Sequence, residues 1–148
     1  MSHLGRLPSS SNDSAEDLYP DVVDGLELTS LLHVRIGALS KGQRKRALLA
    51  IGLLTPQPIL LIDEPFDGLD LRQTREAAET LRWHSSQGRT LFLSVHQIAD
   101  AAKVCDRFVL LNGGRVCAEG SAEELKELAA QRTGHPATDF EEVFLALT

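Results

Sequence analysis

Ile59-Leu60-Leu61-Ile62-Asp63-Glu64 is the stretch of sequence that decides the fold, because four large apolar residues run directly into two carboxylates. Prolines bound the stretch on both sides. An unbroken apolar run of this length predicts a parallel β-strand that is covered on both faces, whereas alternation would indicate a half-exposed strand. Open parallel sheets bind their ligands at the carboxyl ends of strands, which is where Asp63 and Glu64 are expected to lie.

The two carboxylates suit the chemistry of phosphate cleavage. Mg2+ keeps most of its waters and takes only one or two carboxylates together with substrate phosphates, so Asp63 is a candidate magnesium ligand. Glu64 is then a candidate for orienting or deprotonating a water. This pattern is the Walker B motif of phosphate-cleaving P-loop proteins. A strand that ends in a solvated Asp-Glu-Pro turn is the competing interpretation of the same residues.

The composition is that of an ordinary globular protein. The chain has 148 residues, of which 43% are hydrophobic and 24% charged, and its formal charge is −6. A net acidic chain argues against a general nucleic-acid-binding surface, which is normally basic. Cys105 and Cys117 are too far apart for a CxxC motif and have no histidine at metal-ligand spacing. No apolar segment is long enough to cross a bilayer, so membrane association is expected to come through a partner.

The first third of the chain is predicted to hold a polar lead-in and two helices. Residues 1–20 are expected to be a flexible polar segment, followed by one partial domain over 21–148. Apolar residues at loose helical spacing predict a short helix over 21–32. Ser40 is a predicted N-cap for a helix that stops before Pro56, and free backbone amides at such a start can hold an anion. A routine N-cap with a basic first turn is the alternative.

Three basic residues in the first turn of that predicted helix are unusual. Arg44-Lys45-Arg46 stand at the end where the helix dipole disfavours positive charge. We therefore interpret them as a possible contact for a phosphate or a partner, and Gly42 beside them as a place where a ligand can approach the backbone closely.

A strand, a helix and a second strand follow in sequence. After the tight loop 65–70, an apolar stripe predicts a helix over 71–85, and Thr90–Val95 predicts a second buried strand. The two strands are expected to be parallel with a right-handed connection. His96 falls at the carboxyl end of the second strand, the edge expected to hold the two carboxylates. A lone histidine is more often structural, but this position makes His96 a candidate site residue.

The remaining residues predict a hairpin and three helices. A short helix is expected over 98–104, and two apolar runs around Asn-Gly-Gly predict a β-hairpin of strands 107–111 and 115–119. Ser121 opens a capping box for a helix to about residue 130, and residues 139–147 form an amphipathic helix. The fold class is therefore α/β, with a small parallel sheet flanked by helices and a C-terminal β-hairpin.

Four motifs stand in an order and at spacings that resemble the second half of an ABC (ATP-binding cassette) transporter ATPase. They are the signature Leu39-Ser40-Lys41-Gly42-Gln43, the Walker B stretch Ile59 to Glu64, the D-loop Gly68-Leu69-Asp70 and the switch histidine His96. The resemblance runs from about Asp21 to Thr148 and implies a truncated P-loop NTPase-type three-layer fold. The Leu-Ser-Lys-Gly signature is most similar to that of ABC-2 type exporters.

The resemblance implies that ATP and Mg2+ are the cofactors. Asp63 would hold Mg2+ through water, Glu64 would be the general base and His96 would contact the γ-phosphate. Phosphoryl transfer is mainly positioning and charge stabilisation, which agrees with these roles.

The resemblance also implies two kinds of partner and no nucleic acid. Ser40, Gly42 and Gln43 would bind the γ-phosphate of a nucleotide held by a second ATP-binding subunit, identical or different, and Asp70 would pass information between the subunits. A membrane-spanning permease would be the other partner, and the protein would be cytoplasmic and peripheral to the membrane. Lys41 replaces the commoner glycine, and this change is not expected to disable the loop.

No Gly-x-x-x-x-Gly-Lys-Ser/Thr run occurs in the 148 residues, and only 38 residues precede Leu39. A P-loop wraps the phosphates with its amides and lysine, so the chain alone is expected to bind ATP weakly and not to turn it over. The first hypothesis is a truncated ATP-binding subunit of an ABC transporter. The second is a non-hydrolytic half-cassette that regulates a complete ATPase in trans, although Glu64 argues against it. The third is a poorly folded relic.

Overall fold

The computed structural model describes residues 15–148, and the chain divides into two compact units. The first unit ends at Val95 and the second covers His96–Thr148. The expectation that residues 21–148 form one partial domain stays a prediction.

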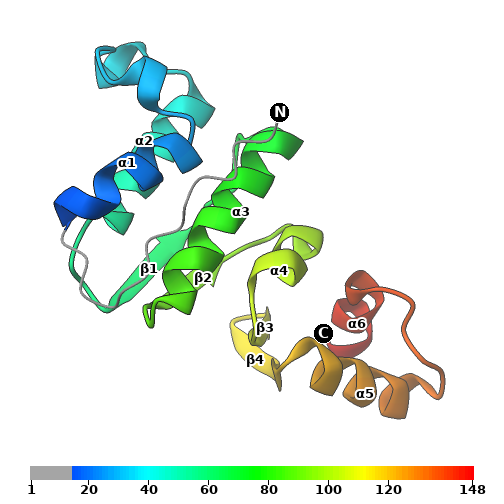
Figure 1. The fold of residues 1–148 in the computed structure, drawn as a ribbon. Helices are drawn as coiled ribbons and strands as arrows, with labels where there is room; N and C mark the ends of the chain where they lie inside the picture. The colour runs from blue at the N-terminus through cyan, green and yellow to red at the C-terminus, as the bar shows by residue number, and fades with distance from the viewer. Residues whose placement is uncertain (1–14) are drawn as a thin grey trace, which may run out of the picture. The chain divides into compact units, whose positions relative to one another are not determined.

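The described part of the first unit, residues 15–95, contains three α-helices and a two-stranded sheet (Figure 1). Its elements are α1 (Ala15–Gly25), two 3-10 turns, η1 (Thr29–Leu31) and η2 (Ile36–Ala38), then α2 (Lys41–Leu53), β1 (Ile59–Asp63), α3 (Leu71–Ser86) and β2 (Thr90–Ser94). All of the helices and strands expected in this part of the chain are present, although the first helix has other bounds.

The first helix begins earlier and ends earlier than expected. α1 starts at Ala15, so residues 15–20 are helical and do not form a flexible lead-in. The remainder of the predicted lead-in, residues 1–14, lies outside the described residues. The helix ends at Gly25 because the chain then turns, and Glu27 has a left-handed φ of 51°. A short turn of 3-10 helix takes the place of the second half of the predicted helix.

The core of the first unit lies between its helices. α1 contacts both α2 and α3. Leu26, Leu53 and Leu81, from the turn after α1, from α2 and from α3, are completely buried. Each fully buried leucine contributes about 2 kcal/mol of transfer free energy, so this apolar contact holds the three helices together.

The two strands of the first unit are parallel. β1 pairs with β2 in a register that runs from Ile59 opposite Thr90 to Asp63 opposite Ser94. The predicted order of strand, crossover helix and strand is thus confirmed. The register brings the carboxyl ends of both strands to one edge, as parallel pairing requires.

One face of this sheet is exposed, and the expectation that both faces are covered is wrong for the described residues. Exposed and half-buried positions alternate along both strands. Leu61 is 80% exposed and its neighbour across the sheet, Phe92, is 60% exposed. α2 contacts β1 and α3 contacts β2, so these helices lie against the half-buried side chains. A continuous apolar run indicates two covered faces only where both have helices on them.

The exposed apolar face of the sheet is expected to make the chain self-associate. Replacing Leu61 with threonine is expected to reduce this association while changing the free energy of unfolding by less than about 0.5 kcal/mol. The Leu61 side chain belongs to an exposed apolar patch and not to a packed core. Light scattering measures the association, and urea unfolding measures stability.

Leu60→Thr is the matched control, because Leu60 is the preceding residue on the half-buried face. We expect this change to cost about 1–2 kcal/mol and to leave self-association unchanged. Equal loss of stability in the two variants would contradict the assignment of the faces.

The second unit contains the predicted hairpin and helices (Figure 1). Its elements are α4 (Ile98–Val104), β3 (Phe108–Asn112), β4 (Arg115–Gly120), α5 (Ala122–Thr133) and α6 (Phe140–Leu147). The strands pair in antiparallel fashion as a sheet of their own. The predicted capping box at Ser121 is present, and Asp139 caps α6.

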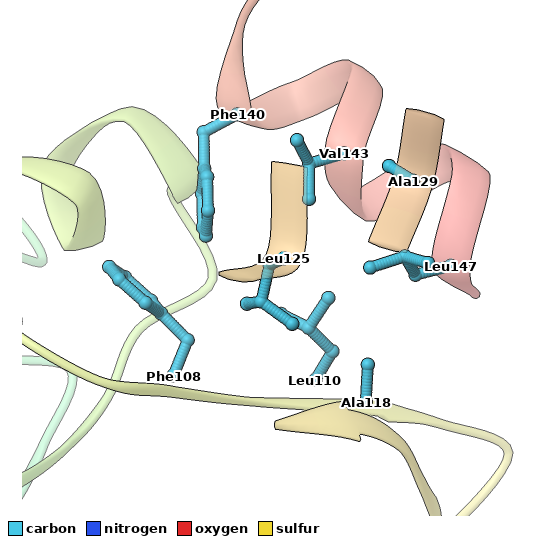
Figure 2. Packing of buried hydrophobic residues seen from close by; sticks show 8 residues of the cluster. All are labelled: Phe108, Leu110, Ala118, Leu125, Ala129, Phe140, Val143 and Leu147. Atoms are coloured by element: carbon cyan, nitrogen blue, oxygen red, sulfur yellow. The ribbon is translucent and has the colours of Figure 1, made fainter. Parts of the chain in front are cut away.

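Eight buried side chains form the core of the second unit (Figure 2). The hairpin contributes Phe108, Leu110 and Ala118, α5 contributes Leu125 and Ala129, and α6 contributes Phe140, Val143 and Leu147. The rings of Phe108 and Phe140 have centroids 4.5 Å apart, a favourable tilted aromatic contact. The last two helices therefore cover one face of the hairpin, as expected of packing elements.

Candidate functional site

The start of α2 is closed by a capping box. The Oγ of Ser40 accepts a hydrogen bond from the backbone N of Gln43 at 3.3 Å, and the side chain of Gln43 accepts one from the N of Ser40 at 2.9 Å. The hydroxyl of Ser40 still has its own proton to donate. The helix start therefore presents ordered polar groups, and the site residues Ser40, Gly42 and Gln43 lie together on it.

The loop 64–70 joins β1 to α3, and Glu64 begins it in a strained conformation. Its φ is 47°, in the left-handed region that non-glycine residues rarely adopt. The backbone N of Glu64 donates to the carbonyl O of Ser94 at 3.0 Å, which fixes this residue to the end of β2. Strained backbone of this kind gathers at functional sites, which is consistent with a special role for Glu64.

Buried side chains anchor the same loop. Pro65 is fully buried and Phe66 is only 6% exposed, although both lie in a turn. The loop is closed by backbone hydrogen bonds from Asp67 N to Glu64 O at 3.2 Å and from Leu69 N to Phe66 O at 3.1 Å. Two buried apolar side chains thus anchor the turn in the protein interior.

Asp70 ends the loop as the N-cap of α3. Its Oδ1 accepts from the backbone N of Gln73 at 2.8 Å, and Gln73 returns a bond to the N of Asp70, which makes a second capping box. The role in subunit communication that the D-loop resemblance implies for Asp70 stays a prediction.

Asp63 offers the chemistry that Mg2+ prefers. Its carboxylate is exposed at the carboxyl end of β1, and the hydroxyl of Ser94 donates to its Oδ1. The Nζ of Lys45 donates to the backbone O of Asp63 at 3.1 Å. Across residues 15–148, no three His, Cys, Asp or Glu side chains form a metal-binding cluster. A magnesium ion held by one carboxylate, waters and phosphate oxygens needs no such cluster.

The helix start and the loop are in contact. Lys41 forms an ion pair with Asp67, with Nζ and Oδ2 2.8 Å apart. The first unit therefore brings the predicted signature, Walker B and D-loop residues together at one end of β1. His96 is the first residue of the second unit, and it is exposed. Its predicted role at the γ-phosphate stays a prediction.

The basic cluster is used differently from the phosphate or partner contact that we expected. Arg46 is only 5% exposed, and its NH1 donates to the carbonyl O of Leu26 at 2.8 Å and lies 3.5 Å from the carboxylate of Glu27. Lys45 reaches the backbone of β1. Arg44 alone of the three is exposed. Two of the three cations thus act within the first unit.

Sequence reasoning missed two residues of the site, Ser94 and Asp67. The pairing of Ser94 with Asp63 follows from aligning the two strands residue by residue, so a register argument could have found it. The contact of Asp67 with Lys41 depends on how α2 packs beside the loop, and no sequence signal indicated it.

Comparison with known proteins adds sequence relatives. The family model for ABC transporter matches residues 7–67. Nod factor export ATP-binding protein I of Neorhizobium galegae is 35% identical over 124 residues, which are 84% of this chain and 36% of that protein. The phosphonates import ATP-binding protein PhnC of Trichormus variabilis is 36% identical over 107 residues, which are 72% of this chain and 44% of that protein.

A solved structure described as an ATP binding subunit of an ABC transporter has a similar fold. It superimposes with a TM-score of 0.77 at 27% identity, over 95% of this chain and 56% of its own. The α/β fold is thus of the P-loop NTPase type. The chain belongs to the ABC transporter family of ATP-binding proteins, and it spans less than half the length of these two curated relatives. In residues 15–148, no helix is both long and apolar enough to span a membrane.

Proposed function

We propose that this chain is the signature and Walker B part of an ATP-binding subunit of an ABC transporter, which couples ATP binding and hydrolysis to transport across a membrane. The observation that carries the proposal is the gathering of Ser40, Asp63, Glu64 and Asp70 around one end of the β1–β2 sheet, on elements that contact one another. The export and import relatives support transport as the setting.

In this proposal the residues divide the work of phosphoryl transfer. The exposed carboxylate of Asp63 would hold hydrated Mg2+, which would supply positive charge to the phosphates. Glu64 orients the water that attacks the γ-phosphorus and accepts its proton as ADP leaves. His96 contacts the γ-phosphate.

The partners follow from the same proposal. Ser40, Gly42 and Gln43 bind the nucleotide of a second ATP-binding subunit, and Asp70 lies where the two subunits meet. A permease subunit carries the pair at the cytoplasmic face of the membrane.

The test is to combine the chain with the P-loop-containing N-terminal part of a related export ATP-binding protein. We expect ATPase activity that neither polypeptide has alone, and we expect Glu64→Gln to lower kcat by about 10²-fold or more, because glutamine keeps the shape but cannot accept the proton. Glu79→Gln, at an exposed carboxylate of α3, is the control and leaves kcat unchanged. Activity that does not respond to Glu64→Gln would contradict the proposed catalytic role.

A second arm tests the regulatory alternative. Here the chain is mixed with a complete ABC ATP-binding subunit, whose own P-loop and base are intact. Stimulation that is lost in Ser40→Arg but kept in Glu64→Gln, without activity in the first arm, would show a regulator acting in trans and would reject hydrolysis by this chain.

A further inference from the structure

α2 and the loop 64–70 approach each other closely at two glycines, Gly42 and Gly68. A Cβ atom placed on Gly42 would lie 2.6 Å from the backbone O of Gly68, which is closer than real Cβ atoms come to any heavy atom. The side chain of Gln73 closes the same space from α3, 3.6 Å away. The loop therefore fills the space that a side chain of residue 42 would need, and any residue other than glycine would clash with the carbonyl of Gly68.

The contact is reciprocal at Gly68. This residue has a left-handed φ of 80°, and a Cβ placed on it would lie 3.2 Å from Cδ of Lys41. The methylenes of Lys41 thus cross the bare backbone of Gly68 before the ammonium reaches Asp67 at 2.8 Å. The helix start thus leaves room for the carbonyl of Gly68, and the loop leaves room for the side chain of Lys41.

Backbone hydrogen bonds also tie the loop to itself and to β2. Asp67 N donates to Glu64 O, Leu69 N donates to Phe66 O, and Glu64 N donates to Ser94. Contacts at Gly42 and Lys41 join this turn to the helix that carries Ser40. A displacement of one is then transmitted to the other.

We propose that Lys41, Gly42, Asp67 and Gly68 form a coupling contact that makes the signature start of α2 and the loop 64–70 move as one body. They are positioning residues: the contact sets where Glu64 and Asp70 lie relative to Ser40. The catalytic meaning of this contact rests on the proposed function, because only in that proposal do Ser40 and Glu64 bind and hydrolyse ATP. Lys41, which replaces the commoner glycine of the signature, supplies the ionic half of the contact.

Amide hydrogen exchange of Asp67 and Leu69 in the full chain tests the coupling without ATP. We expect Gly42→Ala to speed their exchange by about tenfold or more, because the added methyl group displaces the loop carbonyl. Gly52→Ala is the matched control: this glycine is also one residue from an end of α2, and nothing lies within 4 Å of its Cβ position. Exchange at Asp67 and Leu69 is expected to stay unchanged in the control.

The ionic half is tested by charge reversal. Lys41→Glu is expected to speed exchange of the same two amides by about two- to fivefold, the effect of one partly exposed ion pair. Adding Asp67→Lys restores the pair with opposite polarity and is expected to restore slow exchange. If each substitution acted only by disturbing the local structure, the two amides would exchange faster in the double variant than in either single variant.

The outcomes separate this inference from the proposed function. Unchanged exchange in both Gly42→Ala and Lys41→Glu, with the fold intact by circular dichroism, would overturn the coupling and leave the ATPase test untouched. In the complemented ATPase, the coupling predicts that Lys41→Glu lowers kcat and that the charge-reversed pair restores it, while the KM for ATP changes little. Faster exchange without any ATPase activity would support the coupling and reject the catalytic proposal.

Discussion

The free energy of unfolding is expected to fall by about 3 kcal/mol between pH 6.5 and pH 4 because of one buried histidine, His84. Its side chain is 1% exposed. Burial, with the charge of Arg89 as a smaller cause, lowers its pKa from 6.5 to about 4. The unfolded chain therefore takes up a proton over this range that the folded chain does not, so stability is full above pH 6.5 and is lost as the pH falls.

The geometry explains why His84 stays neutral. The NH1 of Arg89 lies 3.3 Å from its Nδ1, so that nitrogen acts as the acceptor, and among residues 15–148 the buried Nε2 has no hydrogen-bond partner. Arg89 also donates to the carbonyl oxygens of Thr55 and Gln57 at 2.9 Å each. A second positive charge on the ring would repel this guanidinium, which is held in place by backbone acceptors.

Urea unfolding at pH 7 and pH 4.5 measures the effect. His84→Leu removes the titrating group, and the difference in stability between the two pH values is expected to shrink by about 2.5 kcal/mol relative to the parent chain. His33→Gln, at an exposed histidine of the same unit, is the control and keeps the parent difference. An unaltered pH dependence in His84→Leu would show that His84 is already protonated in the fold or that other groups dominate.

Arg46→Met is expected to lower the free energy of unfolding by about 2–4 kcal/mol. The guanidinium is buried and donates to the backbone O of Leu26, and it lies beside the carboxylate of Glu27. Methionine keeps the apolar stem but leaves a buried carbonyl without its donor. Glu27 keeps its ion pair with Arg72, so the loss stays below that of an isolated buried charge.

Arg44→Met is the matched control, because Arg44 is two residues away on the same helix and is exposed. We expect that substitution to change stability by less than about 0.5 kcal/mol. Urea unfolding compares the two. Similar losses in both would mean that the effect belongs to positive charge in the first two turns of α2 and not to the buried contact.

Local signals predicted most of the fold. The apolar run ending at Asp63 and the crossover after it predicted a parallel pair, and the Asn-Gly-Gly turn predicted the hairpin; both are present. Capping residues predicted the starts of α2 and α5. The exposure of Leu61 could not be predicted, because burial of a strand depends on which elements cover it and not on the strand itself.

The candidate site likewise contains residues that local signals place and residues that tertiary packing places. Ser40, Asp63 and Asp70 are placed by caps and strand ends, which are local, and their positions in the elements follow the prediction. The left-handed backbone of Glu64 has no local signal, since glutamate does not favour it. The buried state of Arg46 likewise depends on a carbonyl exposed by the turn after α1, which is set by tertiary packing.

The buried Pro65 and Phe66 have a consequence for affinity. A loop that is ordered only by its ligand takes the lost conformational entropy out of the binding free energy, at roughly 1–2 kcal/mol per residue. Here two apolar side chains already hold the turn beside Glu64. The ordering entropy is therefore spent when the chain folds, and a nucleotide that meets this loop encounters a preformed surface.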